Sequence, residues 1–214
     1  PCCLVGSEMC IRDRSLDFSA DSGLFDNGSF SIYSQDTDQR QITTIDKSIV
    51  GNFVNGARGP QFVPNTPPTP LREFKDYIFD QSIDGFAVQF YKSIETESGA
   101  VHNIVYGAEQ ESIDVSRPRY RTETNLMTNA VNSNIGGELY PNKTFPDTET
   151  ERTAFFINNR INISDKTAIV LGARHDTYKL NISIDQLFKN VNPFGYTLVE
   201  QDDGKTSLKF GFIR

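Results

Sequence analysis

Two histidines, His102 and His175, are the only imidazole side chains in this 214-residue sequence, and so its only imidazole metal ligands. Each lies in an alternating segment beside apolar residues: Ile104 is two residues after His102, and Ala173 is two residues before His175. Residues two apart share one face of a strand. The pattern therefore favours structural or interfacial roles over metal ligation.

A group of arginines lies in a long polar segment at about 114–150. Guanidinium groups bind carboxylates and phosphates through paired hydrogen bonds, so closely spaced arginines suit an anionic ligand. The alternative is an ordinary solvated loop. The sequence predicts a ligand-binding group in this loop made of Arg117, Arg119, Tyr120 and Arg121.

Arg174 and Asp176 are two residues apart and so share one face of a strand. Asn158 and Arg160 have the same relation in the preceding segment. We predict that these four residues form a polar network on a water-facing surface. A direct contact with a transported molecule is the alternative for Arg174 and Asp176.

Residues 1–14 differ in character from the rest of the chain. The run 4–14 is similar to one reading frame of a transposase adapter used in DNA library preparation. We therefore interpret 1–14 as adapter-derived sequence that forms no regular element, and a genuine N-terminal segment is the alternative. On this interpretation no metal or redox site is expected from the cysteines of the chain, which all lie there: Cys2, Cys3 and Cys10.

Bulk properties and missing motifs exclude several function classes. The net charge is −7 and the pI is about 4.9, which argues against nucleic acid as a partner because phosphate binding requires a basic surface. No nucleophile–histidine–acid order, glycine-rich phosphate loop or metal-ligand quartet is present. Asp202-Asp203-Gly204 lacks the spaced oxygen ligands of a calcium loop. We therefore predict that the protein is not an enzyme and that it binds no metal.

Alternation of apolar and polar residues with a period of two indicates β-strands throughout the chain. Several of these segments reach the roughly 9–11 residues that a tilted strand needs to cross a membrane. The seven predicted strands are about Leu16–Asp21, Ser29–Thr44, Lys75–Ile94, Val101–Ser112, Glu151–Ile163, Thr167–Ile182 and Ser207–Arg214.

The connections between these strands alternate in length. Short turns are expected at about 23–28, 95–99 and 164–166, and long loops at about 45–75, 114–150 and 183–205. The first long loop contains Pro60, Pro64, Pro67, Pro68 and Pro70, and proline cannot donate to a strand ladder. Short turns at one end and long loops at the other are typical of outer-membrane barrels. A soluble β-sandwich with long loops at one end is the alternative.

The predicted fold is therefore all-β: a partial transmembrane antiparallel β-barrel over 15–214, with seven strands of a larger barrel. Such a barrel has an apolar face toward lipid and a polar face toward the lumen. Gln89 and Glu109 should join the four-residue polar network on the lumen face. The lipid-facing set should contain Phe86, Val88, Phe90, Ile104, Tyr106, Phe155, Ile157, Ile161, Ile169, Leu171, Phe210 and Phe212.

Five segments carry recognisable motifs: Gln81–Phe86, His102–Glu109, Lys143–Phe156, Leu171–Tyr178 and Ser207–Gly211. These segments resemble TonB-dependent outer-membrane receptors, and most closely their haem and haemoglobin uptake branch. The resemblance covers most of 16–214, although the Gly-x-Arg-x-Asp-x-Tyr pattern alone occurs across many of these receptors. The polar trio Asn158-Asn159-Arg160 departs from the Gln, Asp and Glu that relatives often carry there.

This resemblance implies a receptor in the bacterial outer membrane that takes up haem or haemoprotein iron through a barrel of about 22 strands. Neither histidine matches the haem ligand of the family, so haem is expected as transported cargo and not as a bound cofactor. The arginine group would then meet the haem propionates. The implied partners are outer-membrane lipid and the TonB energy-transducing complex, engaged through a plug domain that the sequence lacks. A receptor for a siderophore or another nutrient is the alternative.

Overall fold

The computed structural model describes all residues except 1, 21, 57–58, 193 and 195–196. Its described part is built from antiparallel strands and one short helix, α1 (Gln186–Lys189). The long strands are β1 (Cys2–Ser19), β2 (Asn27–Gly56), β3 (Gly59–Glu95), β4 (Val101–Ser116), β10 (Asp147–Ser164), β11 (Thr167–Ser183) and β12 (Gln201–Ile213). Between β4 and β10 lie β5 (Pro118–Asn125), β6 (Val131–Asn132), β7 (Asn134–Ile135), β8 (Glu138–Leu139) and β9 (Asn142–Lys143).

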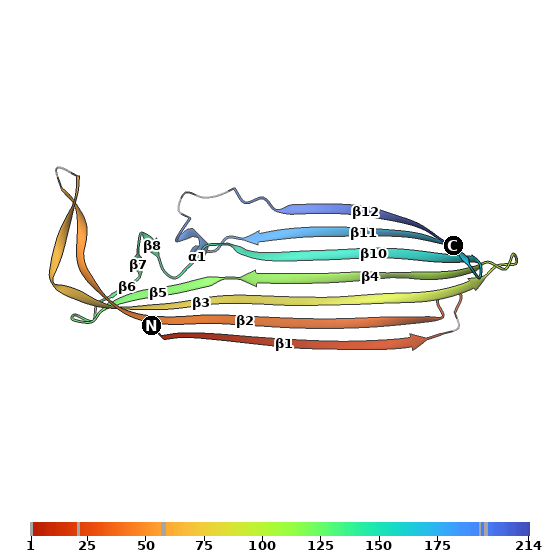
Figure 1. Cartoon of the computed structure of the whole chain (residues 1–214), viewed down its shortest axis with the longest axis horizontal. Helices are drawn as coiled ribbons and strands as arrows, with labels where there is room; N and C mark the ends of the chain where they lie inside the picture. The colour runs from red at the N-terminus through yellow and green to blue at the C-terminus, as the bar shows by residue number, and fades with distance from the viewer. Residues whose placement is uncertain (1, 21, 57–58, 193, 195–196) are drawn as a thin grey trace.

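The long strands form a single sheet in the order β1-β2-β3-β4-β10-β11-β12, and each is antiparallel to its neighbours (Figure 1). Every long strand after β1 therefore pairs with the long strand that precedes it in the chain. The predicted all-β, antiparallel partial barrel is confirmed, and the sheet is not closed, because β1 and β12 form its two edges. The alternative of two face-packed sheets is wrong.

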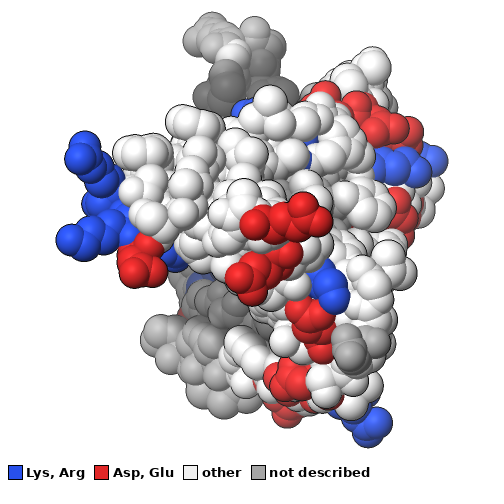
Figure 2. All heavy atoms as spheres, turned by 90° about the vertical axis from the view of Figure 1, so that its right-hand side faces the viewer, with Lys and Arg blue, Asp and Glu red and all other residues white. Residues whose placement is uncertain are grey.

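The connections alternate between the two ends of the sheet as predicted. Short turns join β1 to β2, β3 to β4 and β10 to β11 at the right of Figure 1, and the longer connections lie at the opposite end. Figure 2 looks onto the short-turn end, where acidic and basic side chains are interspersed among uncharged ones. This asymmetry is typical of membrane barrels, whose tight turns and long loops lie on opposite sides of the membrane.

The expectation of a loop at 45–75 is wrong, because strands β2 and β3 continue through it as a two-stranded ribbon beyond the sheet. Asn55 stands opposite Pro60, and Gly51 stands opposite Pro64. In such a ribbon every second N–H points away from the partner strand, so proline can occupy the free edge without removing a ladder bond. The proline rule excludes a central strand, and this segment is an edge.

The other two long connections also contain more structure than the sequence indicates. The segment predicted as a loop at 114–150 includes β5, which pairs with β3 beyond the end of β4. The segment 183–205 includes α1, whose N-cap Asp185 accepts a hydrogen bond from the backbone N–H of Phe188, and the start of β12. These short elements carry little hydrophobic periodicity, which explains why pattern analysis does not find them.

Strand register places the predicted apolar set on one face of the sheet. Residues that stand opposite each other in neighbouring strands share a face. Phe90 is opposite Tyr106, Tyr106 is opposite Ile157, and Leu171 is opposite Phe210. Counting in steps of two from these anchors brings all twelve predicted residues to this apolar face, so the predicted segregation is confirmed.

No second layer covers either face of the sheet in the described part of the chain. Phe155 is 58% exposed and Leu171 is 43% exposed, although both are large apolar side chains. Such an extended apolar surface is unstable in water and suits a lipid environment. None of the helices in the described ranges is long and apolar enough to cross a membrane.

The expectation that 1–14 forms no regular element is wrong. Strand β1 includes nearly all of this segment and pairs with β2 without a break, from Cys2 opposite Thr44 to Ser19 opposite Asn27. The physical reason is that ladder hydrogen bonds join backbone groups, whatever the side chains. The edge of β2 can therefore form ladder hydrogen bonds with any extended segment that continues the strand beyond Leu16 and Phe18 toward the N-terminus.

The side chains of β1 nevertheless change their pattern at Arg14. Leu16 and Phe18 stand opposite Phe30 and Gly28, so they belong to the apolar face. Beyond them Arg14 falls on that apolar face, whereas Ile11 falls on the polar face and is 61% exposed. The adapter origin of 1–14 stays a prediction, and this reversal of the alternation is in line with it.

Candidate functional site: the polar face and the long-loop end

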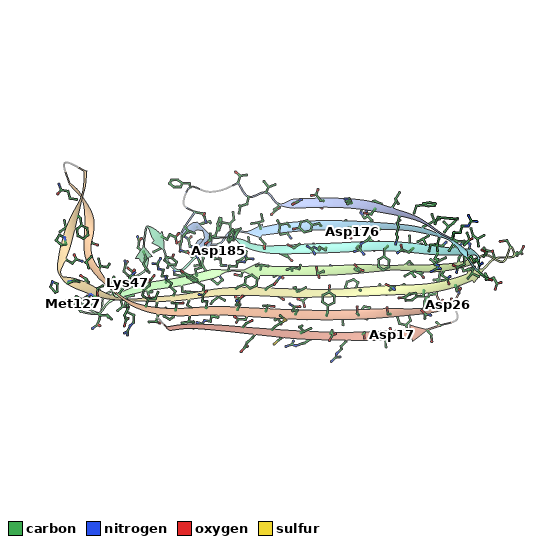
Figure 3. All side chains as sticks on the ribbon, viewed as in Figure 1. Asp17, Asp26, Lys47, Met127, Asp176 and Asp185 are labelled. Atoms are coloured by element: carbon green, nitrogen blue, oxygen red, sulfur yellow. The ribbon has the colours of Figure 1, made fainter. Side chains whose placement is uncertain are left out.

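The polar face of the sheet carries an ion-paired group on β4 and β11. Arg174 donates from Nε to Asp176 Oδ1 at 2.8 Å and from a terminal nitrogen to Glu109 Oε2 at 2.9 Å. Figure 3 labels Asp176 on β11. The pairing works because Arg174 and Asp176 are two apart on one strand, while β10 between the strands presents the small Ala154 opposite Asp176 and Glu109. The arginine can therefore reach across a strand.

A second polar group lies beside the first. The Tyr33 hydroxyl donates to Glu111 Oε2 at 3.1 Å, and the Arg152 guanidinium lies 3.5 Å from Glu111 Oε1. Arg152 also lies over the Tyr178 ring at 5.8 Å. A hollow of about 320 Å³ is lined by residues of both groups. Sequence analysis missed Tyr33, Glu111 and Arg152. The spacing of two residues between Glu109 and Glu111 was a usable signal for Glu111.

The predicted four-residue network is only partly gathered in space. Arg174 and Asp176 touch, but Arg160 donates to Asn162 at 3.1 Å, toward the short-turn end of β10. Asn158 packs against Gly172, where an added Cβ would lie only 2.3 Å from the Asn158 side-chain oxygen. All four residues share the polar face, and Glu109 is the partner that joins β4 to Arg174.

The predicted arginine group lies mainly in strand β5, not in a loop. Arg119 donates to Asn142 Oδ1 at 3.0 Å and to Glu138 Oε2 at 3.3 Å. Arg121 donates to Glu73, and both guanidinium groups lie over the Tyr140 ring. Their donors thus face protein carboxylates and amides.

The other two members of the group point elsewhere. Arg117 precedes β5 and lies over the Phe79 ring at 4.9 Å. Tyr120 stands opposite Asp76 on the other face of β5 from its neighbours and is 41% exposed. The four residues therefore do not converge on one open pocket, and contact with an anionic ligand stays a prediction.

Ion pairs link the ribbon formed by β2 and β3 to β5, near the point where the ribbon leaves the sheet. Glu73 is 4% exposed and forms ion pairs with Lys47, Lys75 and Arg121, and Lys47 also pairs with Glu123. These five residues are called the Glu73 cluster below. Figure 3 labels Lys47 at the long-loop end of the molecule. Sequence analysis missed the cluster because its members come from three strands.

The Glu73 cluster should respond to acid. Burial raises the pKa of Glu73, but hydrogen bonds from Arg121, Lys47 and Lys75 outweigh burial, and the net pKa lies below its usual value. A lowered folded-state pKa means that the stabilisation is complete above the unfolded pKa of about 4.3 and is lost as pH falls further. Hydrogen exchange should therefore show a ribbon base that is protected at neutral pH and that loses protection as pH falls below the unfolded pKa of a glutamate.

The matched variant for this prediction is Glu73→Gln, which keeps the shape of the side chain but cannot titrate. Its ribbon base should be less protected at neutral pH and should show a smaller further loss of protection in acid, since only the Glu123 carboxylate of the cluster still titrates. Equal protection of the original chain at neutral and acidic pH would contradict the prediction.

Each of the two histidines contacts an uncharged polar side chain in the structure. His102 Nδ1 lies 3.0 Å from Asn159 Nδ2, and His175 Nδ1 lies 2.9 Å from Thr206 Oγ1. Both histidines fall on the apolar face by register. Within the described ranges no group of three or more histidine, cysteine, aspartate or glutamate residues could hold a metal ion.

A search against family models matches residues 11–213 to the TonB-dependent receptor-like β-barrel family. The match covers nearly the whole chain, and it includes residues 11–14 of the segment interpreted as adapter-derived. The chain therefore belongs to the TonB-dependent receptor β-barrel family. No curated protein matches the chain.

Membership of this family assigns a class of function. TonB-dependent receptors are outer-membrane transport receptors, not enzymes, and they take up nutrients with energy supplied through TonB. The apolar face described above is then the lipid-facing surface, and the polar face with the Arg174 and Glu111 groups is the lumen wall.

Proposed function

We propose that this chain forms part of the barrel wall of a receptor that imports haem or haemoprotein iron across the outer membrane. The assignment to the class of TonB-dependent receptors rests on the family match. The haem assignment is supported by the sequence resemblance alone, above all by Phe145-Pro146-Asp147 at the start of β10 and Gly172-x-Arg174-x-Asp176-x-Tyr178 in β11. Haem is the cargo in this proposal, and no resident cofactor is invoked.

The two faces of the sheet have different roles in the proposal. The lumen wall would contact a plug domain through which TonB acts, because its paired charges offer both donors and acceptors to a polar surface. The long-loop end would face the outside and meet the ligand first. Arg117 and Tyr120 are the members of the arginine group for which no carboxylate partner is recorded in the described structure, so they are the better candidates for meeting haem propionates.

Growth on defined iron sources tests the ligand. The full-length receptor should be expressed in a bacterium that lacks its own haem and siderophore receptors. Growth on haem or haemoglobin, but not on ferric siderophores, is the expected result, and growth should stop when TonB is deleted. Growth on a siderophore alone would replace haem with the alternative ligand class and would leave the receptor class unchanged.

A charge-removing variant tests the ligand contact separately. Arg117→Gln should weaken haem binding to cells about tenfold, the factor that corresponds to one lost charge-assisted contact of roughly 1.4 kcal/mol. Binding can be followed by the Soret absorbance of cell-bound haem, with Arg72→Gln as a control in an exposed ion pair of the same region. Equal losses in both variants would argue against a specific role for Arg117.

A further inference from the structure

Most of the buried side chains of this protein lie at the long-loop end, although the sheet is far larger. The faces of the sheet carry no second layer in the part that the structure describes. The ribbon base, the segment 114–150 and the segment 183–205 each contribute to the buried set at this end. Among the described residues that set is Leu71, Glu73, Asp76, Ile135, Tyr140, Asn142, Lys143 and Phe188.

A first link joins the ribbon base to the segment 114–150. Arg121 of β5 donates to Glu73, and its guanidinium lies over the Tyr140 ring at 5.8 Å. Arg119, on the same face of β5, lies over that ring at 5.7 Å. The Tyr140 hydroxyl donates to Glu138 Oε2 at 2.6 Å. The buried Tyr140 ring is therefore in contact with two guanidinium groups, one of which is bound to the ribbon.

A second link runs from β5 to β9. Arg119 donates from Nε to Asn142 Oδ1 at 3.0 Å, and Asn142 donates from Nδ2 to the backbone oxygen of Leu139 at 3.0 Å. Arg119 also stands opposite Asn142 in the strand pairing. Asn142 is fully buried, and both ends of its amide are used. A satisfied buried amide of this kind fixes β9 at one position on β5.

A third link joins β9 to α1 and to the start of β10. The buried Lys143 ammonium donates to Asp147 Oδ2 at 2.6 Å and to Asp185 Oδ2 at 2.8 Å. Asp185 is also the N-cap of α1. At the other end of α1, Asn190 donates to the backbone oxygen of Pro141 at 2.7 Å. The helix is therefore fastened to β9 at both of its ends.

We propose that the Glu73 cluster, the elements β5 to β9 and α1 form one cooperative unit, called the outer cap below, which opens and closes as a single body. Its contacts run from Lys47 to Asp185 through side chains and a single step along the chain, and Figure 3 labels both residues at the long-loop end. If β5 alone moved away, Glu73 would lose Arg121 while it remained buried. Breaking up a buried charge network in part is strongly unfavourable, so partial opening is disfavoured.

The outer cap connects the outside of the receptor to the lumen wall. Lys143 holds Asp147, the first residue of β10, and the same strand carries Arg152 on the lumen wall. A molecule that displaces the ribbon would therefore loosen α1 and the start of β10 as well. Coupling between distant sites requires an element with two states that both sites bias, and the closed and open cap are those states.

Glu73→Gln tests the coupling from the ribbon end, in the full-length receptor in lipid vesicles. Millisecond hydrogen exchange is measured at the amides of Lys189 and Asn190, which bond within α1. Their exchange should accelerate about tenfold, the factor that corresponds to one lost charge-assisted contact, although neither residue touches Glu73. The amides of β5 should accelerate by a similar factor, because one opening exposes them all. Asp46→Asn breaks an exposed ion pair of the same ribbon and should leave α1 unchanged.

Asp185→Asn tests the coupling from the opposite end. Asparagine is a good N-cap, so α1 keeps its cap while the ion pair with Lys143 is lost. Exchange of the β5 amides beside the ribbon should accelerate together with that of α1. In the variant that carries both Glu73→Gln and Asp185→Asn, every amide of the outer cap should accelerate by about the product of the two single factors, because both changes favour the same opening.

Acceleration that stays within the connection carrying the substitution would overturn the proposal, because the connections would then open independently. Heat-modifiable mobility in gels checks that each variant has assembled its barrel. None of these outcomes bears on the ligand, so the proposed uptake of haem stands or falls on the growth experiments alone.

Discussion

Replacement of Leu171 by arginine is expected to prevent assembly of most of the protein in the outer membrane. Leu171 lies on the lipid-facing surface between Asn159 and Phe210, and it is 43% exposed in the described structure. An arginine at the midplane of a barrel costs roughly 2–4 kcal/mol. That is a large part of the 5–15 kcal/mol by which typical proteins are stable. The folded fraction, measured by heat-modifiable mobility of isolated outer membranes, should fall severalfold.

Asn158→Ser is the control for the Leu171 variant because residue 158 lies on the lumen wall of the adjoining strand. Its folded fraction should remain near that of the original protein, since water in the lumen solvates a small polar side chain. If Leu171→Arg assembled as well as Asn158→Ser, the assignment of the apolar face to lipid would be wrong.

Gly107→Ala is expected to destabilise the barrel by about 2–3 kcal/mol, in the range for added volume in a packed site. A Cβ at position 107 would lie 2.2 Å from the backbone oxygen of Val88 and 2.8 Å from the Phe156 ring. The ring can turn, but the carbonyl belongs to the neighbouring strand β3, so β3 and β4 would have to move apart. Urea unfolding of the receptor in vesicles measures the loss.

Gly211→Ala provides the matched comparison for the Gly107 variant. A Cβ there meets its nearest neighbour, Cβ of Val170, at 3.5 Å, which is an ordinary van der Waals distance. Its stability should change by less than about 0.5 kcal/mol, as for surface substitutions in general. Equal effects at both positions would mean that the loss of glycine flexibility, not the contact with Val88, causes the destabilisation.

Strand content and the two faces of the sheet could be predicted because they depend on local sequence. Side chains of a strand alternate between its two faces, so the spacing of Phe155 and Ile157 places them on one face without any knowledge of the partner strands. The same reasoning placed Arg174 and Asp176 together, because a spacing of two fixes their common face. Three of the strand pairings, β1 with β2, β3 with β4 and β10 with β11, also followed, since short turns bring consecutive antiparallel strands together.

Predictions from local sequence were wrong where pairing with a neighbouring strand, not the composition of the segment, determines the backbone conformation. Prolines such as Pro64 predicted a loop, but the ribbon offers free edges on which proline is allowed. The adapter-like segment was expected to lack structure, but the edge of β2 pairs with it through backbone groups. In both cases the neighbouring strand supplies hydrogen bonds that the segment's own sequence does not reveal.

The particular contacts of the candidate sites were decided by tertiary structure alone. Glu73 meets Lys47 and Arg121 because the registers of β2, β3 and β5 bring them to one level, over separations of 26 and 48 residues. The spacing of Asn159 from Ile157 and Ile161 places it on the apolar face, but only the register shows that it stands opposite Ile104 and Leu171. A sequence thus determines which face a residue occupies, because that is a property of one strand. Which partner residue it contacts depends on register, which is a property of two paired strands.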